Sequence, residues 1–419
     1  MKILLLTNIP PVVPSSRAGG AQRTSLLLRA LEAVGQVDLG LVCAPHYPPR
    51  ERWEELVALR PEVRRWHWQE PKPFRGAHRI FRRLPQPLHK TIWEPLVERK
   101  RYTAQPAVAR QVRQYVFDQG YDLVVARYLR PAAVAGLHAN DFPVPVLVDV
   151  DDLDSEVLRL RLEQEAQISR FIWASHKYRV GKMRQLMLEV LHHSVGAFLV
   201  NPADQKLIEP TPSWLLPNIP YHFLQGVIPP LAPPVVESKD LLFVGQLGYE
   251  PNRQGLNRFL LNVWPTVMAA VPGVRLRIVG AFIRPEDQEA WGRIEGVDVV
   301  GFVDDLRTEY ARCAFTVCPV YWGGGSKIKI LESLAYGRTC VLTHHAHEGL
   351  SQDLYHRNHV WVGDKDDAFA QGCIELLSDF QGRQALAESG REVVDQKFTF
   401  SAFCEVVENA VRKAVAKQA

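Results

Sequence analysis

Short apolar segments alternate with amphipathic stretches along the first half of the chain, and this alternation constrains the fold more than any other feature. Strand-like runs occupy residues 3–6, 37–42, 122–125, 144–150 and 197–200, with helical spacing between them, as in 22–33 and 155–193. Strands that alternate with helices predict a parallel sheet, because each parallel connection needs a crossover. The first half is therefore expected to be a doubly wound α/β domain.

A proline-rich segment, residues 219–239, interrupts the pattern. Strand-like runs then return at 241–244, 274–279, 297–300, 315–320 and 339–343, and the chain closes with an amphipathic helix at 401–415. The pattern predicts a first domain at 1–218, a linker at 219–239, a second domain at 240–395 and a terminal helix at 396–419. Two doubly wound domains joined by a hinge would bind a ligand in the cleft between them.

The composition is that of a water-soluble globular protein. Hydrophobic residues make up 47% and charged residues 23% of the 419 residues, and no apolar run reaches the length of about 18 that spans a bilayer. The six cysteines show no CxxC pair and no metal-ligand spacing. They are expected to be buried, reduced thiols of a cytoplasmic protein.

Positive charge is concentrated in one segment, residues 60–102, which holds twelve Lys or Arg against four Glu and is interleaved with aromatic residues. Two interpretations stay open. The segment suits an anionic membrane surface, with aromatic rings at headgroup level, or it is a solvated excursion whose tryptophans pack underneath. Nucleic acid is not expected as a partner, because the net charge is only +4 and no binding module accompanies the segment.

The clearest chemical signal is a glycine triplet, 323–325, between a strand and a helix. A helix that starts at Ser326 would offer free N–H groups and a positive dipole end to a phosphate. Lys327 and Lys329 add positive charge, and Glu332 lies close enough for its carboxylate to accept hydrogen bonds from a ribose diol. Taken alone, the triplet is equally well explained as a tight turn before a solvated helix face.

The run from Gly324 to Gly337, with 341–343 and 346–350 after it and 242–252 before it, resembles the donor site of retaining glycosyltransferases of family 4, the glycosyl transferases group 1. The resemblance implies a two-domain GT-B fold whose last helix crosses back to the first domain. It also implies a nucleotide-diphosphate sugar, a UDP- or GDP-sugar, held mainly by the second domain. Such enzymes use the nucleotide sugar as a co-substrate and need no bound metal and no other cofactor.

The same resemblance assigns roles to residues. Glu332 matches the ribose-binding glutamate, and Ser326 with Lys327 matches the diphosphate site. The expected donor-binding residues are Gly19, Gly20, Gly245, Gln246, Asn252, Gly324, Gly325, Ser326, Lys327, Ile328, Leu331 and Glu332. Gly324 departs from the family, which often has a sugar-contacting glutamate there, and this leaves the donor sugar open.

Two segments of the first half are also expected near the reaction. Gly19 and Gly20 resemble a glycine-rich loop that faces the cleft, although a plain strand-to-helix turn explains them too. The acidic stretch 149–155 contains the Asp-x-Asp pattern of metal-binding transferases, but a helix cap that lines the acceptor side is preferred. Arg23, Asp151 and Asp154 are thus expected on the acceptor side, and Asp152, Lys327 and Lys329 in catalysis.

The function predicted from the resemblance is a retaining glycosyltransferase that moves a sugar to a saccharide, lipid-linked or other cell-surface precursor. It is expected in the cytoplasm, with peripheral association with the inner face of the membrane as the further interpretation of segment 60–102. Two alternatives remain: a nucleotide-sugar 2-epimerase of the same architecture, and a donor-binding partner subunit without turnover.

Overall fold

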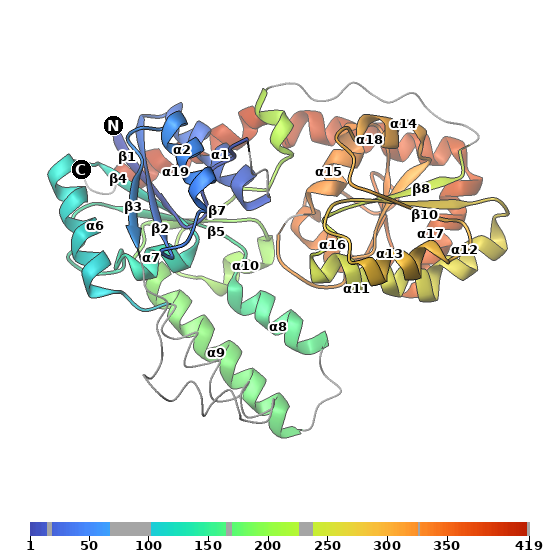
Figure 1. The fold of residues 1–419 in the computed structure, drawn as a ribbon, viewed down its shortest axis with the longest axis horizontal. Coiled ribbons are helices and arrows are strands. Elements are labelled where there is room, and N and C mark those ends of the chain that lie inside the picture. Colours follow the sequence, from blue (N-terminus) through green and yellow to red (C-terminus); the bar gives the residue numbers. More distant parts are fainter. Residues whose placement is uncertain (15–18, 68–101, 165–169, 226–237, 326, 417–419) are drawn as a thin grey trace. The chain divides into compact units, whose positions relative to one another are not determined.

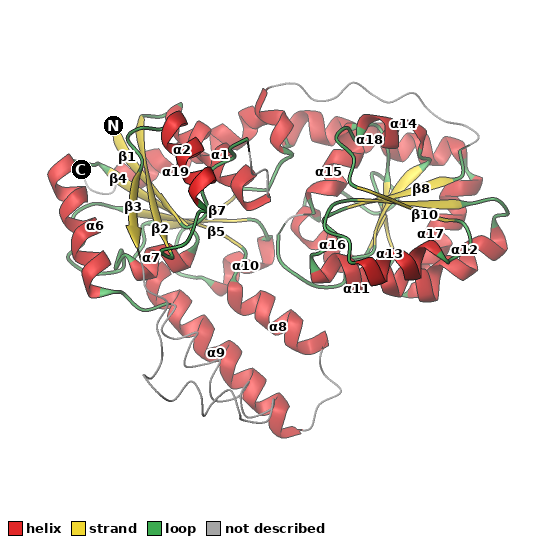
Figure 2. Cartoon of the chain, in the orientation of Figure 1, coloured by secondary structure: helices red, strands yellow, loops and turns green. Residues whose placement is uncertain are grey.

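The computed structural model describes residues 1–14, 19–67, 102–164, 170–225, 238–325 and 327–416 (Figure 1). Contacts within the chain divide it into two units, Met1–Leu216 with Phe403–Ala419, and Pro217–Ala402. The terminal helix thus belongs to the first unit. Each unit is built from one sheet with helices around it, as the colouring in Figure 2 shows.

The first unit contains a seven-stranded parallel sheet in the order β3-β2-β1-β4-β5-β6-β7. The middle strands read as continuous apolar runs, and residues such as Leu5 and Val125 are fully buried. Burial of both strand faces is typical of parallel sheets, whose crossovers place helices on each side. The strands are β1 (Lys2–Thr7), β2 (Gln36–Cys43), β3 (Arg64–His67), β4 (Leu123–Arg127), β5 (Val146–Asp151), β6 (Gly196–Leu199) and β7 (Ser213–Leu215).

Several helices of this unit bury an apolar face in the core beside the sheet. Helix α6, for example, buries Val108, Val112 and Val116, which recur every four residues and join the core beside the strands. The helices are α1 (Gly19–Glu32), α2 (Arg50–Leu59), α6 (Pro106–Gln119), α7 (Leu129–Val134), α8 (Asp154–Gln164), α9 (Arg170–His192), α10 (Pro202–Leu207) and α19 (Phe400–Ala416).

The second unit contains a six-stranded parallel sheet in the order β10-β9-β8-β11-β12-β13. Its strands are β8 (Asp240–Val244), β9 (Arg275–Val279), β10 (Val297–Gly301), β11 (Phe315–Cys318), β12 (Cys340–Leu342) and β13 (Trp361–Val362). Phe243 and Phe315 of the two central strands share one core with Phe369 of a covering helix. The strand order reverses between β8 and β11, and in such sheets ligands bind outside the carboxyl ends of the strands at that point.

The helical segments of the second unit include several short turns. They are η2 (Tyr221–Gln225), α11 (Glu250–Arg258), a π-helical turn η3 (Phe259–Val263), α12 (Trp264–Ala270), α13 (Pro285–Gly292), α14 (Arg307–Arg312), α15 (Ile328–Ala335), α16 (His344–His347), η4 (Glu348–Leu350), α17 (Asp366–Ser378) and α18 (Phe380–Lys397). None of the helices in the described ranges has the length and apolar character needed to cross a bilayer.

The predicted fold class is confirmed, with parallel sheets of seven and six strands, but several element boundaries differ. The helix expected to start at Ser326 begins at Ile328, and the strand expected at 315–320 ends at Cys318. The helix expected at 254–270 contains the π-helical turn Phe259–Val263 just before Pro265. Proline lacks the N–H that a regular helix uses, so the hydrogen-bond ladder is displaced there. The single helix expected at 155–193 appears as α8 and α9, and residues 165–169 between them are outside the described ranges.

Candidate functional site

The carboxyl ends of β8 and β11 bring the two halves of the expected donor signature together. These strands are hydrogen-bonded neighbours in parallel register, so their following loops leave the sheet at the same edge. Gly245 and Gln246 follow β8, while Tyr321–Gly325 follows β11 and leads into α15.

Lys329, in the first turn of α15, is linked through Asn252 of α11 to the loop that follows β8. Its Nζ donates to Asn252 Oδ1 at 2.8 Å, and Asn252 Nδ2 donates to the carbonyl of Gln246 at 2.9 Å. A Cβ at Gly245 would lie 2.9 Å from the Lys329 ammonium, so a larger residue there would require that side chain to shift. Burial lowers the pKa of Lys329 from its ordinary value, as expected for an ammonium removed from water.

Lys327 is bonded to the glycine triplet that precedes it. Its Nζ donates to the carbonyls of Gly323, Gly324 and Gly325 at 3.3, 3.1 and 2.8 Å. Gly323 and Gly325 have φ values of 101° and 80°, a region that favours glycine. A Cβ at Gly323 would also lie 2.6 Å from Cγ of Pro251. Glycine is therefore favoured by backbone geometry at 323 and 325, and Lys327 bonds to the carbonyls of all three residues.

Glu332 lies one helical turn beyond Lys329, and only 17% of its side chain is exposed. Tyr310 donates its hydroxyl to Glu332 Oε2 at 3.1 Å, and the Tyr310 ring stacks on Tyr336 with centroids 4.5 Å apart. Burial raises the pKa of Glu332 to about 7, although the bond from Tyr310 acts in the opposite direction. A carboxylate kept this poorly solvated is a strong acceptor for the hydroxyls of a ligand.

His345 contacts the glycine triplet from the short helix α16, which follows β12. One ring nitrogen, Nε2, is 2.9 Å from the carbonyl oxygen of Gly323, and the other, Nδ1, is 3.3 Å from Glu348 Oε2. Its bond to Glu348 lowers the pKa of that carboxyl. The adjacent His344 has a side chain that is 68% exposed.

Sequence reasoning also passed over Tyr310 and His222, which both approach Glu332. His222 Nδ1 lies 3.9 Å from Glu332 Oε1. No local motif marks either residue, because each is brought to Glu332 by the fold from a distant part of the chain.

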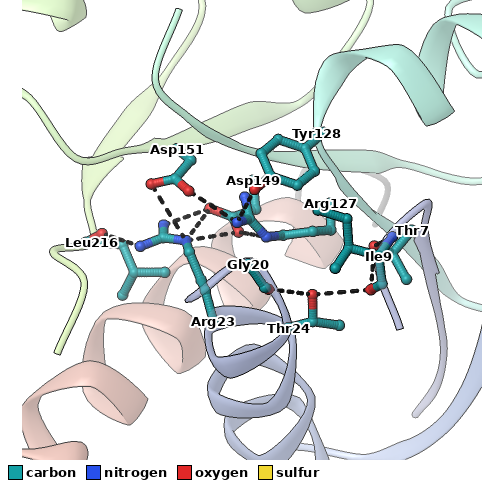
Figure 3. A network of polar contacts seen from close by, with 10 residues as sticks. All are labelled: Thr7, Ile9, Gly20, Arg23, Thr24, Arg127, Tyr128, Asp149, Asp151 and Leu216. Carbon is teal, nitrogen blue, oxygen red and sulfur yellow. Dashed lines mark hydrogen bonds and ion pairs between the residues drawn. The ribbon is translucent and has the colours of Figure 1, made fainter. Parts of the chain in front are cut away.

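A buried polar network lies at the carboxyl ends of β4 and β5 in the first unit (Figure 3). Arg23 donates to Asp149 at 2.6 Å and to the carbonyl of Leu216 at 2.9 Å. Arg127 Nη2 donates to Asp151 Oδ2 at 2.9 Å, and Arg127 Nε is 3.3 Å from Asp149 Oδ2. Two arginines and two aspartates thus neutralise one another where water is excluded.

Two residues of this network have unusual backbone conformations. Tyr128 and Asp151, at the ends of adjacent strands, have φ values of 74° and 67°. Such values are costly for residues with a Cβ and persist only where the surroundings impose them. Arg127 supplies part of that constraint, because its Nη2 donates to both the Tyr128 hydroxyl and the Asp151 carboxylate.

The first-unit residues expected near the reaction lie in different surroundings. Gly19 and Gly20 form the first residues of α1. Arg23 and Asp151 lie together in the buried network, so Arg23 has a structural role and its acceptor-side role remains a prediction.

Asp152 is half-exposed, between β5 and α8. Asp154 begins α8 and accepts a hydrogen bond from the Tyr102 hydroxyl. The roles of Asp152 in catalysis and of Asp154 on the acceptor side remain predictions.

Two other predictions fall outside the described residues. Ser326, the expected helix cap, is one, and most of the basic segment 60–102 is the other, since 68–101 are not described. Within the described ranges, no group of three His, Cys, Asp or Glu side chains is placed to hold a metal ion.

Comparison with known proteins places this site in a family context. Residues 238–379 match the model of the family Glycosyl transferases group 1, and no curated protein matches the sequence. Among solved structures, the chain is similar to sucrose-phosphate synthase from Thermosynechococcus elongatus, with a TM-score of 0.66 and 16% identity over 100% of both chains.

Two further structures are similar at full length. HepE of Anabaena in complex with UDP has a TM-score of 0.63 and 12% identity over 98% of this chain and 100% of that one. TarM, which a second structure names as a protein of S. aureus, has a TM-score of 0.61 and 9% identity over 99% of this chain and 98% of that one. At such low identities these likenesses show the fold.

Proposed function

We propose that this chain, which has the GT-B fold and carries a glycosyl transferases group 1 domain in residues 238–379, is a retaining glycosyltransferase. The donor is a nucleotide-diphosphate sugar, a UDP- or GDP-sugar, bound by the second unit. The acceptor is a saccharide or a lipid-linked precursor. No metal and no cofactor other than the donor takes part.

The observation that carries the proposal is the arrangement along the first two turns of α15. Lys329 and Glu332 lie one turn apart at the carboxyl edge of the sheet, beside the bonded glycine triplet. Positive charge at the helix start is followed one turn later by a carboxylate. This order fits a phosphate-sized anion at the helix start and a ribose at Glu332. HepE, a protein of the same fold, is described in complex with UDP-glucose.

The residues would act mainly on the leaving group. As the bond between the sugar and the diphosphate breaks, negative charge develops on the phosphate oxygens. Lys327, Lys329 and the N-terminal N–H groups of α15 stabilise that charge, and the acceptor hydroxyl enters on the face from which the diphosphate departs. This route needs no protein nucleophile. The route also requires the two ammonium groups to change hydrogen-bond partners. Lys327 must leave the glycine carbonyls and Lys329 must leave Asn252 to bind phosphate oxygens.

The test is release of nucleotide from a panel of UDP-, GDP- and ADP-sugars, with and without EDTA. Wild type is compared with Glu332→Ala and with Glu289→Ala, an exposed glutamate of α13 paired with Arg293. We expect slow hydrolysis of one donor that survives EDTA, is lost in Glu332→Ala and is unchanged in Glu289→Ala. Wild type that neither binds nor hydrolyses any donor would contradict the proposal.

A second candidate rests on Gly324, which stands where the family often has a sugar-contacting glutamate. A donor-binding partner subunit without turnover would bind a nucleotide sugar and release nothing. An epimerase would instead convert the donor to a stereoisomer with no acceptor. Chromatography of the reaction with one donor separates the three cases, because only the transferase consumes an added acceptor.

A further inference from the structure

His222 lies beside Glu332 although the two residues are far apart in the sequence. It belongs to η2 (Tyr221–Gln225), in the same unit as α15. The neighbouring Phe223 is 1% exposed and packs edge-on against the imidazole, with ring centroids 4.8 Å apart. This anchored neighbour fixes where the imidazole points, and its Nδ1 is 3.9 Å from Glu332 Oε1.

The separation of 3.9 Å is too long for a direct hydrogen bond between Nδ1 and Oε1. A hydroxyl oxygen that lies about 2.8 Å from each atom can span it, accepting from the imidazole and donating to the carboxylate. Glu332 Oε2 already accepts from Tyr310, so Oε1 is the oxygen that faces the histidine. The pair therefore offers a donor and an acceptor to one hydroxyl group.

The other ring nitrogen supports the same assignment. Nε2 of His222 is buried and has no hydrogen-bond partner among the described residues. A buried N–H without an acceptor costs more than an acceptor nitrogen without a donor, so the proton of the neutral ring belongs on Nδ1. Burial lowers the pKa of His222, which keeps the ring neutral at pH 7.

We propose that His222 is a further donor-site residue, whose Nδ1–H donates to one ribose hydroxyl while that hydroxyl donates to Glu332. The proposal rests on the proposed function, because it assumes that a nucleotide occupies the site. It makes His222 a specificity residue for ribonucleotides, since a deoxyribose would leave both the imidazole N–H and the carboxylate without their shared partner.

The experiment measures binding of UDP, 2′-deoxy-UDP and 3′-deoxy-UDP, and of the three guanosine counterparts, to the intact chain by calorimetry. The variants are His222→Phe, which keeps an aromatic ring without nitrogen, and His222→Asn, whose amide N–H replaces Nδ1–H. His46→Phe, at an exposed position of the first unit, is the control.

Wild type should bind UDP or GDP about fivefold to tenfold more tightly than one of the two deoxy forms. His222→Phe should discriminate clearly less than wild type, because Glu332 alone then binds the hydroxyl. His222→Asn should keep most of the discrimination, and His46→Phe should behave as wild type.

Two results overturn the inference in different ways. If wild type binds a ribonucleotide and His222→Phe keeps full discrimination between the ribo and deoxy forms, His222 does not contact the ribose and only the inference fails. The same holds if His222→Phe weakens all three nucleotides equally. If wild type binds neither UDP nor GDP, the proposed nucleotide site fails and takes the inference with it.

Discussion

The guanidinium of Arg23 lies 2.6 Å from a carboxylate oxygen of Asp149, and both side chains are buried. The pair joins the start of α1 to the end of β5, and Leu216 completes the contacts of the arginine with its carbonyl. Removing one member of such a pair leaves an uncompensated charge where water cannot reach it, which is more costly than the pair itself is favourable.

The first prediction follows from this asymmetry. Arg23→Met and Asp149→Leu should each lower the free energy of unfolding by about 3–5 kcal/mol, whereas the double variant should lose clearly less than the sum. Arg127 and Asp151 still balance each other in the double variant. Urea unfolding of the three variants provides the measurement, and strictly additive losses would contradict the expectation.

A surface pair serves as the control for that cycle. Arg50 and Glu54 are bonded at 2.7 Å, but their side chains are 92% and 60% exposed. Water and salt screen such pairs. Arg50→Met should therefore leave the unfolding midpoint unchanged.

Arg23 also shows where sequence reasoning stopped. Its place beside Gly19 and Gly20 predicted a residue that reaches the acceptor, but its partner Asp149 lies 126 positions away. Only the order of strands in the sheet brings the end of β5 to the start of α1. Lys327, Lys329 and Glu332 lie on one short segment, so their grouping could be predicted from spacing alone, whereas Tyr310 and His222 could not.

The same distinction holds for the fold. Continuous apolar runs marked the central strands, because both faces of those strands are buried. Three of the four edge strands, β3, β7 and β13, have only four, three and two residues. Segments this short carry no readable period, and their pairing depends on the neighbouring strand rather than on their own composition.

The second prediction concerns Gly255, in α11. A Cβ there would lie 1.8 Å from the carbonyl oxygen of Pro319, which follows β11. Gly255→Ala should lower the thermal midpoint, because backbone must move to admit the methyl group. Gly292→Ala in α13 meets nothing within 4 Å and should be neutral or slightly stabilising. Equal midpoints for both variants would contradict the close approach.

The third prediction uses the carboxyl group of Glu332, whose pKa burial raises to about 7 from an ordinary 4.5. Below pH 4.5 the group is protonated in both the folded and unfolded states. As pH rises from 4.5 towards 7, ionisation of the Glu332 carboxyl stabilises the unfolded chain. In the folded chain the same carboxyl ionises only near pH 7, so the folded state is stabilised less. The contribution of Glu332 to stability is thus present at low pH and lost as pH rises.

Glu332→Gln should therefore raise the free energy of unfolding of the ligand-free protein relative to wild type at pH 8. This difference from wild type should be about 2–3 kcal/mol larger at pH 8 than at pH 5. The amide keeps an acceptor for Tyr310, and the other groups that face the site are His222 and Tyr336. Unfolding by urea at the two pH values measures the difference. Glu289→Gln, at an exposed position, should show no such dependence, and a Glu332→Gln difference independent of pH would contradict the prediction.

The fourth prediction separates the roles of Lys329 and Asn252 in the proposed reaction. Lys329→Met removes the charge expected at the leaving diphosphate and should lower kcat/KM by about 10²-fold, mostly through kcat. Asn252→Ala removes the acceptor that holds the ammonium at 2.8 Å, so it should raise KM several-fold with a smaller change in kcat. The double variant should be no worse than Lys329→Met, because Asn252 would act through the lysine.

Lys365→Met, at an exposed position, controls for loss of a positive charge. If the two single losses multiply in the double variant, Asn252 acts independently of Lys329 and the positioning role is wrong.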